Sequence, residues 1–277
     1  MYTKHWRLTG QPFENRWDSQ FYYPAEDHQA ALMKLHYAVE NRRAAALVCG
    51  PTGIGKTLLV HELRRQLDEA FQPLIHLVFP AMNEHEWLRS MVDALDGGSS
   101  EPATNDRAAC LRRFEKFLSG NLDRKQHAVV VIDEAHLLEQ NYLLEPLRLL
   151  LNVAAERSGG ESAWTLVLVG QESLPAQVER YHALDERLAV KCLMNRFKPE
   201  ETQSYIQHRL RVVGGDANTI FTPEALDAVE SLSQGLPRRI NRLCDLALMI
   251  GFAEETPRIS ADIIENVYQE LAPPIGA

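Results

Sequence analysis

A glycine-rich segment has the residue types and spacing of a phosphate-binding loop. Residues 50–57 read Gly-Pro-Thr-Gly-Ile-Gly-Lys-Thr, a full G-x-x-x-x-G-K-T pattern. The segment follows an apolar run, residues 44–49, and opens a helical pattern, which is the context such a loop requires. Its backbone N–H groups can converge on phosphate oxygens, Lys56 can reach the β- and γ-phosphates, and Thr57 can ligate Mg²⁺. The alternative is a chance glycine-rich turn. We expect the following residues to bind ATP: Gly50, Pro51, Thr52, Gly53, Ile54, Gly55, Lys56, Thr57 and Leu58.

Two adjacent carboxylates follow a second apolar run. Residues 129–132 are Val-Val-Val-Ile, and Asp133 and Glu134 come directly after them. Ligands of open α/β sheets bind at the carboxyl ends of the strands. We expect Asp133 to hold Mg²⁺ through water and Glu134 to act as the general base on the attacking water. The alternative is a solvated Asp-Glu turn, but the glycine-rich loop upstream favours ATP hydrolysis.

Two further polar positions could touch the γ-phosphate. Gln171 follows the apolar run 165–169, where it would lie between the first two motifs and contact the γ-phosphate or the attacking water. Arg238 follows Gly-Leu-Pro at a predicted helix start, from which it could swing onto the γ-phosphate. The alternatives are a loop glutamine with no role and a solvated basic face made of Arg238, Arg239 and Arg242.

The elements that must position these residues alternate in type. The pattern predicts strands at 44–49, 73–79, 128–132 and 164–169, and helices at 56–70, 84–95, 107–118 and 142–157. This alternation predicts a three-layer α/β fold with a parallel sheet. Beyond residue 199 the pattern predicts only helices, at 199–213, 222–233, 236–253 and 259–271. We therefore expect an α/β domain over residues 1–196, with an N-terminal segment 1–43, and a helical lid domain over 197–277.

Composition excludes several classes of protein. The formal net charge of -9 excludes a uniformly basic nucleic-acid coat, although a local basic patch stays open. The four cysteines lack the spacing of a zinc site or a disulfide framework. The N-terminus lacks a signal-peptide pattern, and the apolar runs are too short to cross a bilayer. We expect a cytoplasmic protein, which would reach the inner membrane only through a partner.

Taken together, the motifs resemble those of AAA+ ATPases, and within them the general secretion pathway protein A (ExeA-type) group. The likeness also includes LTGQPF at 8–13, LDERL at 184–188, FTPEAL at 221–226 and GLPRRINRLCDLAL at 235–248. The resemblance implies five parallel strands, a helical lid, ATP between them, and a ring in which an arginine of one subunit completes the next subunit's site. Arg187 is our candidate for that arginine, with Arg180 and Arg196 as rivals and a plain surface role as the alternative. It also implies that the N-terminal segment, with Pro12, Phe13, Phe21 and Tyr22, lies near the adenine, unless the aromatic residues pack in a core.

The resemblance suggests two functions. One is an ATP-driven assembly or remodelling factor of a secretion or pilus system, like ExeA or MshM, with an inner-membrane component as its client. We expect a short form without a peptidoglycan-binding domain, and a homo-oligomer. The alternative is an ATP-dependent DNA-binding regulator of transposition of the TniB, TnsC or MuB type.

Overall fold

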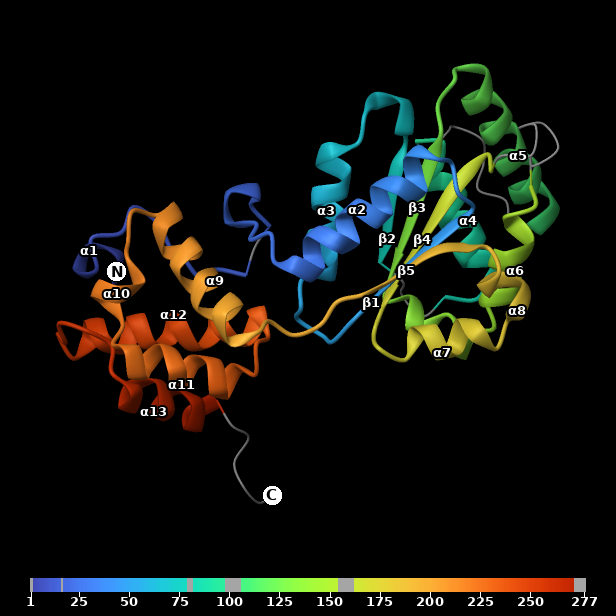
Figure 1. The fold of residues 1–277 in the computed structure, drawn as a ribbon. Coiled ribbons are helices and arrows are strands. Elements are labelled where there is room, and N and C mark those ends of the chain that lie inside the picture. Colours follow the sequence, from blue (N-terminus) through green and yellow to red (C-terminus); the bar gives the residue numbers. More distant parts are fainter. Residues whose placement is uncertain (1, 16, 79–81, 98–105, 154–161, 272–277) are drawn as a thin grey trace. The chain divides into compact units, whose positions relative to one another are not determined.

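The computed structural model describes residues 2–15, 17–78, 82–97, 106–153 and 162–271, which form two compact units (Figure 1). An α/β unit contains residues 26–51 and 56–194. A helical unit contains the described residues of 2–25, 52–55 and 195–271.

The α/β unit contains a five-stranded parallel sheet with the strand order β2-β3-β4-β1-β5. Four strands lie within a residue or so of their predicted positions: β1 Ala45–Cys49, β2 Leu74–Val78, β3 Ala128–Asp133 and β4 Trp164–Gly170. The expected fold class is confirmed. The fifth strand, β5 Leu188–Leu193, was implied only by the family resemblance. As an edge strand with several exposed residues, it lacks the continuous apolar run that marks a central strand.

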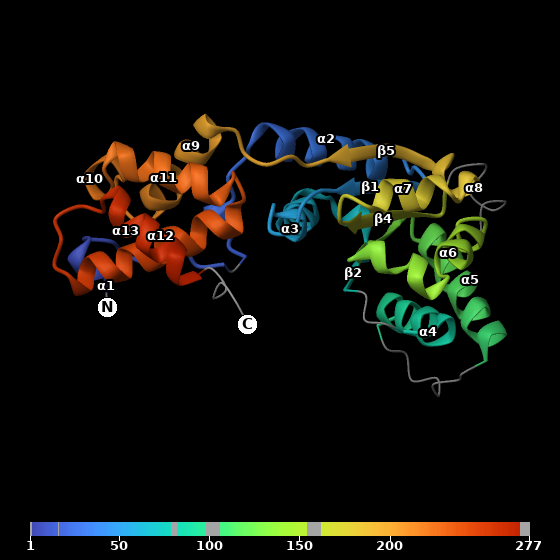
Figure 2. The same ribbon diagram turned by 90° about the horizontal axis from the view of Figure 1, so that it is seen from below.

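Helices cover both faces of this sheet (Figure 2). Side chains alternate between the two faces along each strand, and in β1 both sets are buried: Leu47 packs in the cluster with α4 and α5, whereas Val48 points the other way. One layer contains α2 Glu26–Glu40 and α3 Lys56–Gln66, and the other contains α4 Glu84–Leu95, α5 Arg107–Asp123, α6 Leu144–Leu150, α7 Leu174–Glu179 and α8 His182–Asp185. The helix predicted over 142–157 is shorter, and its last part falls outside the described residues.

Among its described residues, the helical unit has the four predicted helices and two additional short α-helices, α1 Tyr2–His5 and α10 Ala217–Ile220. The start of α11 is the predicted one, because the side chain of Thr222 accepts a hydrogen bond from the amide of Ala225 and a proline follows it. In the described part of the chain, no helix is both long and apolar enough to span a membrane. The bounds are α9 Pro199–Val212, α11 Pro223–Ser233, α12 Pro237–Ala253 and α13 Ala261–Leu271.

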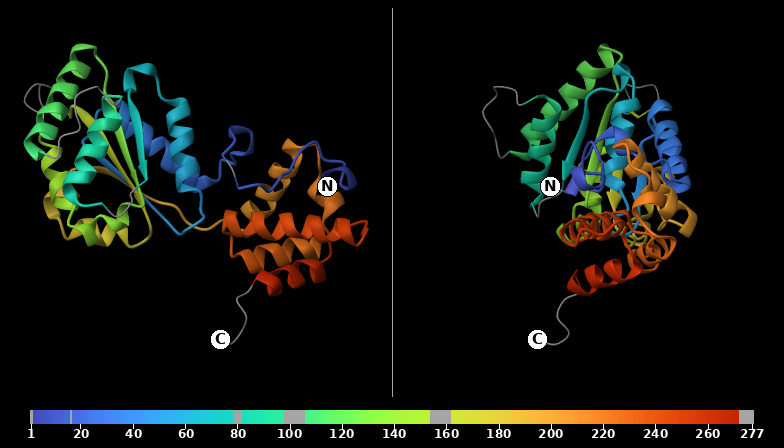
Figure 3. Two further views of the ribbon diagram at one scale, coloured as in Figure 1. Left: turned by 180° about the vertical axis from the view of Figure 1, so that it is seen from behind. Right: turned by 90° about the vertical axis from the view of Figure 1, so that its left-hand side faces the viewer.

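The N-terminal segment packs in the helical unit, which differs from the predicted division at 196/197. The segment, with α1 Tyr2–His5, runs along α12 (Figure 3), and the indole N–H of Trp6 donates to the carbonyl of Leu248 at 2.9 Å. Arg209 of α9 is 4% exposed and donates to the carbonyls of Pro12 and Glu14. Phe13, which was a candidate for the adenine site, is 1% exposed in the same core. The sequence pattern did not reveal this packing because the segment contains almost no regular structure from which a partner could be inferred.

The start of α12 depends on a glycine with a left-handed backbone. Gly235 has a φ of +67°, and its carbonyl accepts from the amide of Phe197 at 2.9 Å. A Cβ at this position would lie 2.2 Å from the carbonyl oxygen of Phe197, which is far inside contact distance. Gly214 has a similar φ of +79°, but a Cβ there would meet no atom within 4 Å.

These two glycines give a matched pair of stability predictions. Gly214→Ala should cost about 1 kcal/mol, because only the backbone conformation is disfavoured. Gly235→Ala should cost about 2–4 kcal/mol, because a clash with the backbone adds to the same conformational cost. Urea unfolding of both variants measures the difference, and equal losses would contradict the role of Gly235 as the point of close approach.

A buried histidine makes the stability of the α/β unit sensitive to pH. His127 is 0% exposed, and its Nε2 lies 2.8 Å from the hydroxyl oxygen of Thr165. That hydroxyl donates to the carbonyl of Arg43 at 2.7 Å, so Nε2 of His127 must donate to Thr165. Nδ1 is buried and has no hydrogen-bond partner among the described residues, so a second proton there would be unpaired and the ring is neutral. Burial, aided by the charge of Arg42, lowers the pKa of His127 from 6.5 to about 4.

The lowered pKa of His127 should make the folded protein less stable in acid. Between about pH 6.5 and 4 the unfolded chain takes up a proton that the folded chain refuses, so the free energy of unfolding falls as the pH falls through this window. His127→Gln keeps a donor for Thr165 and removes the titration. From pH 7 to pH 5, wild type should lose about 2 kcal/mol more than this variant in urea unfolding. Parallel curves would show that His127 does not titrate as the geometry requires.

Candidate functional site

The glycine-rich loop joins β1 to α3. Gly53 and Gly55 adopt φ values of +85° and +110°, which only glycine takes up at little cost. Ile54 between them is fully buried. Lys56 is the first residue of α3, so the loop ends at the free N–H groups of a helix N-terminus. This is the backbone form of a phosphate cradle.

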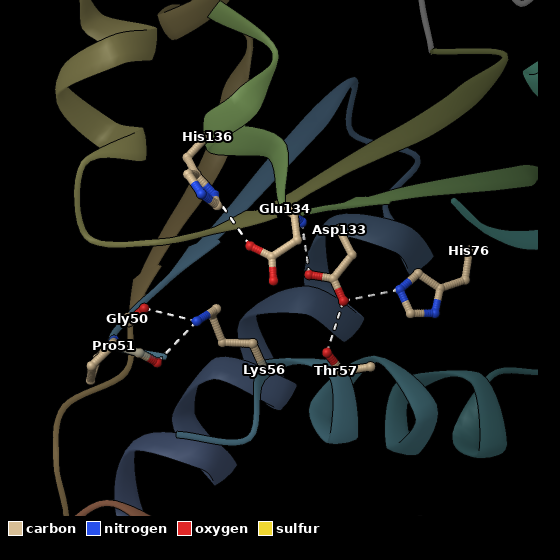
Figure 4. A network of polar contacts seen from close by, with 8 residues as sticks. All are labelled: Gly50, Pro51, Lys56, Thr57, His76, Asp133, Glu134 and His136. Atoms are coloured by element: carbon tan, nitrogen blue, oxygen red, sulfur yellow. Dashed lines mark hydrogen bonds and ion pairs between the residues drawn. The ribbon is translucent and has the colours of Figure 1, made fainter. Parts of the chain in front are cut away.

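Lys56 is held at the start of the helix by the loop itself. Its side chain is largely buried, with the residue 8% exposed. The ammonium Nζ donates to the carbonyl of Gly50 at 2.8 Å and to that of Pro51 at 3.0 Å (Figure 4). A positive charge is therefore fixed directly beside the loop.

Asp133 has partners on both carboxylate oxygens. Its Oδ2 accepts from the hydroxyl of Thr57 at 2.8 Å and lies 3.3 Å from Nε2 of His76, and its Oδ1 accepts from the amide of Glu134 at 2.9 Å (Figure 4). Burial raises the pKa of Asp133, but the hydrogen bonds from His76, Thr57 and Glu134 lower it by more. The pKa therefore lies below its usual value, and the carboxylate is charged at neutral pH.

The strand order explains why these residues meet. β3 and β1 both pair with β4, with Ile132 opposite Leu168 and Cys49 opposite Gly170. Since the strands are parallel, the glycine-rich loop after β1 and the carboxylates after β3 leave the sheet at the same edge. Asp133 and Thr57, 76 positions apart in sequence, are thus in hydrogen-bond contact.

Glu134 has an unusual backbone and an accessible side chain. Its φ is +54° and its ψ is 32°, in the left-handed region that non-glycine residues seldom adopt. Its side chain is 45% exposed, and Oε2 lies 3.4 Å from Nδ1 of His136 (Figure 4). The backbone turn directs the carboxylate away from that of Asp133, so the two acids have different surroundings.

The donor set fits Mg²⁺ and a triphosphate. The Thr57 hydroxyl and the Asp133 carboxylate are oxygen donors 2.8 Å apart, and hard oxygen ligands suit Mg²⁺. Mg²⁺ held by these two residues would supply positive charge that offsets the negative charge of the phosphates. Leu58, the last of the expected nucleotide-binding residues, is half-buried in the first turn of α3.

The γ-phosphate contacts of Gln171 and Arg238 stay predictions, and the structure gives the local surroundings of both residues. Gln171 is exposed one residue after β4, the strand between β3 and β1. Gly170 before it lets the turn after β3 approach closely, because a Cβ would lie 3.1 Å from the amide nitrogen of His136. Within the helical unit, which includes residues 52–55, the amide of exposed Arg238 donates to the carbonyl of Gly53 at 3.2 Å.

The arginines considered for a neighbouring subunit's site all have partners in their own chain. Arg187 donates to the carbonyl of Arg148 at 3.1 Å and to the side chain of Asn152. The two rivals are held by other side chains: Arg180 pairs with Glu139 at 2.5 Å, and Arg196 donates to Gln234 at 2.8 Å.

His76 is a site residue that none of the sequence motifs indicates. It lies in the strand Leu-Ile-His-Leu-Val, where a polar residue interrupts an otherwise apolar run. That interruption was the available signal, but it identified no partner, since the register of β2 against β3 is set by the fold.

Comparisons with known proteins agree with this fold. A family model described as an AAA domain matches residues 39–178. General secretion pathway protein A of Aeromonas hydrophila is 30% identical over 97% of this chain, and the chain spans about half of that relative, 48% of its length.

Solved structures of similar fold have low sequence identity. The ORC2 protein of Aeropyrum pernix, solved in ADPNP-ADP complexes, matches with a TM-score of 0.70 at 17% identity, covering 94% of this chain and 71% of that one. Drosophila ORC, solved bound to DNA, matches with a TM-score of 0.68 at 16% identity, covering 95% of this chain and 65% of that one. These likenesses bear on the fold alone. Because the AAA model spans half of the residues and includes the glycine-rich loop and both carboxylates, the chain belongs to the AAA domain family.

Proposed function

We propose that this protein binds ATP with Mg²⁺ and hydrolyses it. The observation that carries the proposal is the 2.8 Å hydrogen bond between Thr57 and Asp133 beside the fixed charge of Lys56. The loop amides hold the phosphates, and Lys56 exchanges its two carbonyl partners for phosphate oxygens. Thr57 and Asp133 hold the metal, and Glu134 takes a proton from the attacking water.

Two further side chains complete the proposed reaction centre. Gln171 would orient the attacking water, since it follows the strand between the two motifs. Arg238 would contact the γ-phosphate, and its support is the backbone contact of its own helix start with Gly53. Arg187 would act on a neighbouring subunit of a homo-oligomer, after leaving its partners on Arg148 and Asn152.

The secretion-related relative suggests what the ATP hydrolysis is used for. We propose that ATP hydrolysis drives assembly or remodelling in a secretion or pilus system, in the cytoplasm, with an inner-membrane protein as the client. Support comes from the 30% identity to general secretion pathway protein A over almost the whole chain.

A second candidate, an ATP-dependent DNA-binding regulator, is favoured by one observation. Arg196 and Arg239 both donate to the same side-chain oxygen of Gln234, at 2.8 and 3.4 Å. Arg242 is exposed one turn further along α12, and no ion pair of the described residues includes any of the three. Guanidinium groups gathered around a neutral oxygen suit a phosphate backbone. The formal net charge of -9 weighs against long-range attraction to DNA.

Substitutions in the nucleotide site test the first proposal. Glu134→Gln should bind a fluorescent ATP analogue with nearly unchanged affinity and lose turnover by about a hundredfold or more, because the water loses its base. Lys56→Ala should lose binding itself, because the phosphates lose a fixed charge. The matched control is Glu145→Gln, an exposed carboxylate on α6 paired with Arg148, which should hydrolyse ATP like wild type. Undiminished phosphate release by Glu134→Gln would remove this residue as the base.

A DNA-binding measurement separates the two candidate functions. If the second is right, labelled duplex DNA should bind in the presence of ATP, with affinity falling steeply as salt rises. The double variant Arg239→Ala/Arg242→Ala should then lower the log–log salt slope by about 2, whereas Arg112→Ala in the α/β unit should not change it. Absence of duplex binding by wild type at low salt would reject the second function and leave the first.

A further inference from the structure

His76 is a polar side chain at a position where the fold requires burial. β2 pairs with β3 so that His76 lies opposite Val131 and Val78 opposite Asp133. Residues two apart in a strand point to the same face, so His76 and Asp133 share one face of the sheet. The side chain of His76 is only 13% exposed. Burying an imidazole has a desolvation cost unless its nitrogen has a partner, and Asp133 is that partner.

The direction of the hydrogen bond fixes the form of the ring. A charged carboxylate can only accept, so Nε2 of His76 must carry the proton that faces Oδ2 of Asp133 across 3.3 Å. The other neighbour of the ring is His61 of α3, edge to face with ring centroids 5.8 Å apart. The imidazole is thus held between α3 and the carboxylate (Figure 4).

Two side chains restrain Oδ2 of Asp133. In the structure Oδ2 accepts from the Thr57 hydroxyl and from His76, and only Oδ1 is held by backbone, through the Glu134 amide. Mg²⁺ would bind a lone pair of the Thr57 oxygen and leave its O–H free to donate to Oδ2, so Thr57 and His76 would together restrain that oxygen. Partners of this kind around metal-binding carboxylates change metal affinity by about 10–100-fold when removed.

We propose that His76 is a positioning residue that holds the Asp133 carboxylate in the orientation that binds Mg²⁺. The proposal rests on the proposed nucleotide function and adds a residue outside the sequence motifs to its metal site. His76 does not touch ATP in this proposal. Its removal should therefore lower the affinity for the metal ion and leave the affinity for metal-free nucleotide unchanged.

The test separates metal affinity from nucleotide affinity in the full-length chain. Mn²⁺ binding in the presence of ATP is followed by electron paramagnetic resonance, and affinity for a fluorescent ATP analogue is measured in EDTA. His76→Leu and His76→Asn should both weaken Mn²⁺ binding by about 10–100-fold, because leucine has no donor and the shorter amide does not reach Oδ2. Their analogue affinity in EDTA should stay within about twofold of wild type. His76→Gln, whose amide nitrogen can take the place of Nε2, should recover most of the Mn²⁺ affinity.

The neighbouring histidine provides the matched control. His61→Leu removes the ring that packs on His76 without removing a hydrogen bond to Asp133, so its Mn²⁺ affinity should equal that of wild type. Folding of each variant is checked by thermal unfolding, and His76→Asn serves if His76→Leu does not fold. Normal Mn²⁺ affinity in a folded His76→Asn variant overturns the proposal. An equally large loss of ATP-analogue affinity in EDTA also overturns it, because it would indicate that His76 acts through the packing of the site and not through the metal. If wild type binds no nucleotide, the proposed function itself fails, which is a distinguishable result.

Discussion

The parallel pairing of β1, β4 and β3 is the constraint on which the site depends. Cys49 is opposite Gly170 and Ile132 is opposite Leu168, so the glycine-rich loop, Gln171 and the acidic pair leave the sheet at one edge. A slip of one residue in β3 would turn Asp133 to the other face and bury it against α4 and α5. Such a slip would be costly because it would bury the Asp133 carboxylate without its Thr57 and His76 partners.

Much of this arrangement could be predicted from local pattern. Each motif can be recognised from a few neighbouring residues: the glycines at 53 and 55, Lys56 at the helix start, and the acidic pair after an apolar strand. The helix starts at Thr222 and at Pro237 could be predicted for the same reason, because an N-cap residue and a proline determine the backbone conformation of the residues next to them.

Features that depend on distant partners were not readable in this way. β5 is an edge strand with polar residues, and only the family resemblance implied it. His76 interrupts β2 with a polar group whose partner is set by register. The packing of Phe13 in the helical core could not be distinguished from a place beside the adenine, because a buried aromatic residue looks the same in both cases. Whether Arg187 serves a neighbouring subunit is likewise a property of an assembly and of no single segment.

The N-terminal segment has a consequence for how the chain folds during synthesis. Residues 2–25 leave the ribosome before the α/β unit, but their partners, such as Leu248 for Trp6 and Arg209 for Glu14, are made after it. The helical unit therefore cannot complete its core until the sheet and its helices have been translated. Until then Trp6 and Phe13 are exposed apolar groups on a nascent chain, the kind of surface that chaperones protect. The α/β unit is thus expected to fold first, and the core of the helical unit closes afterwards from segments that precede and follow the α/β unit in the sequence.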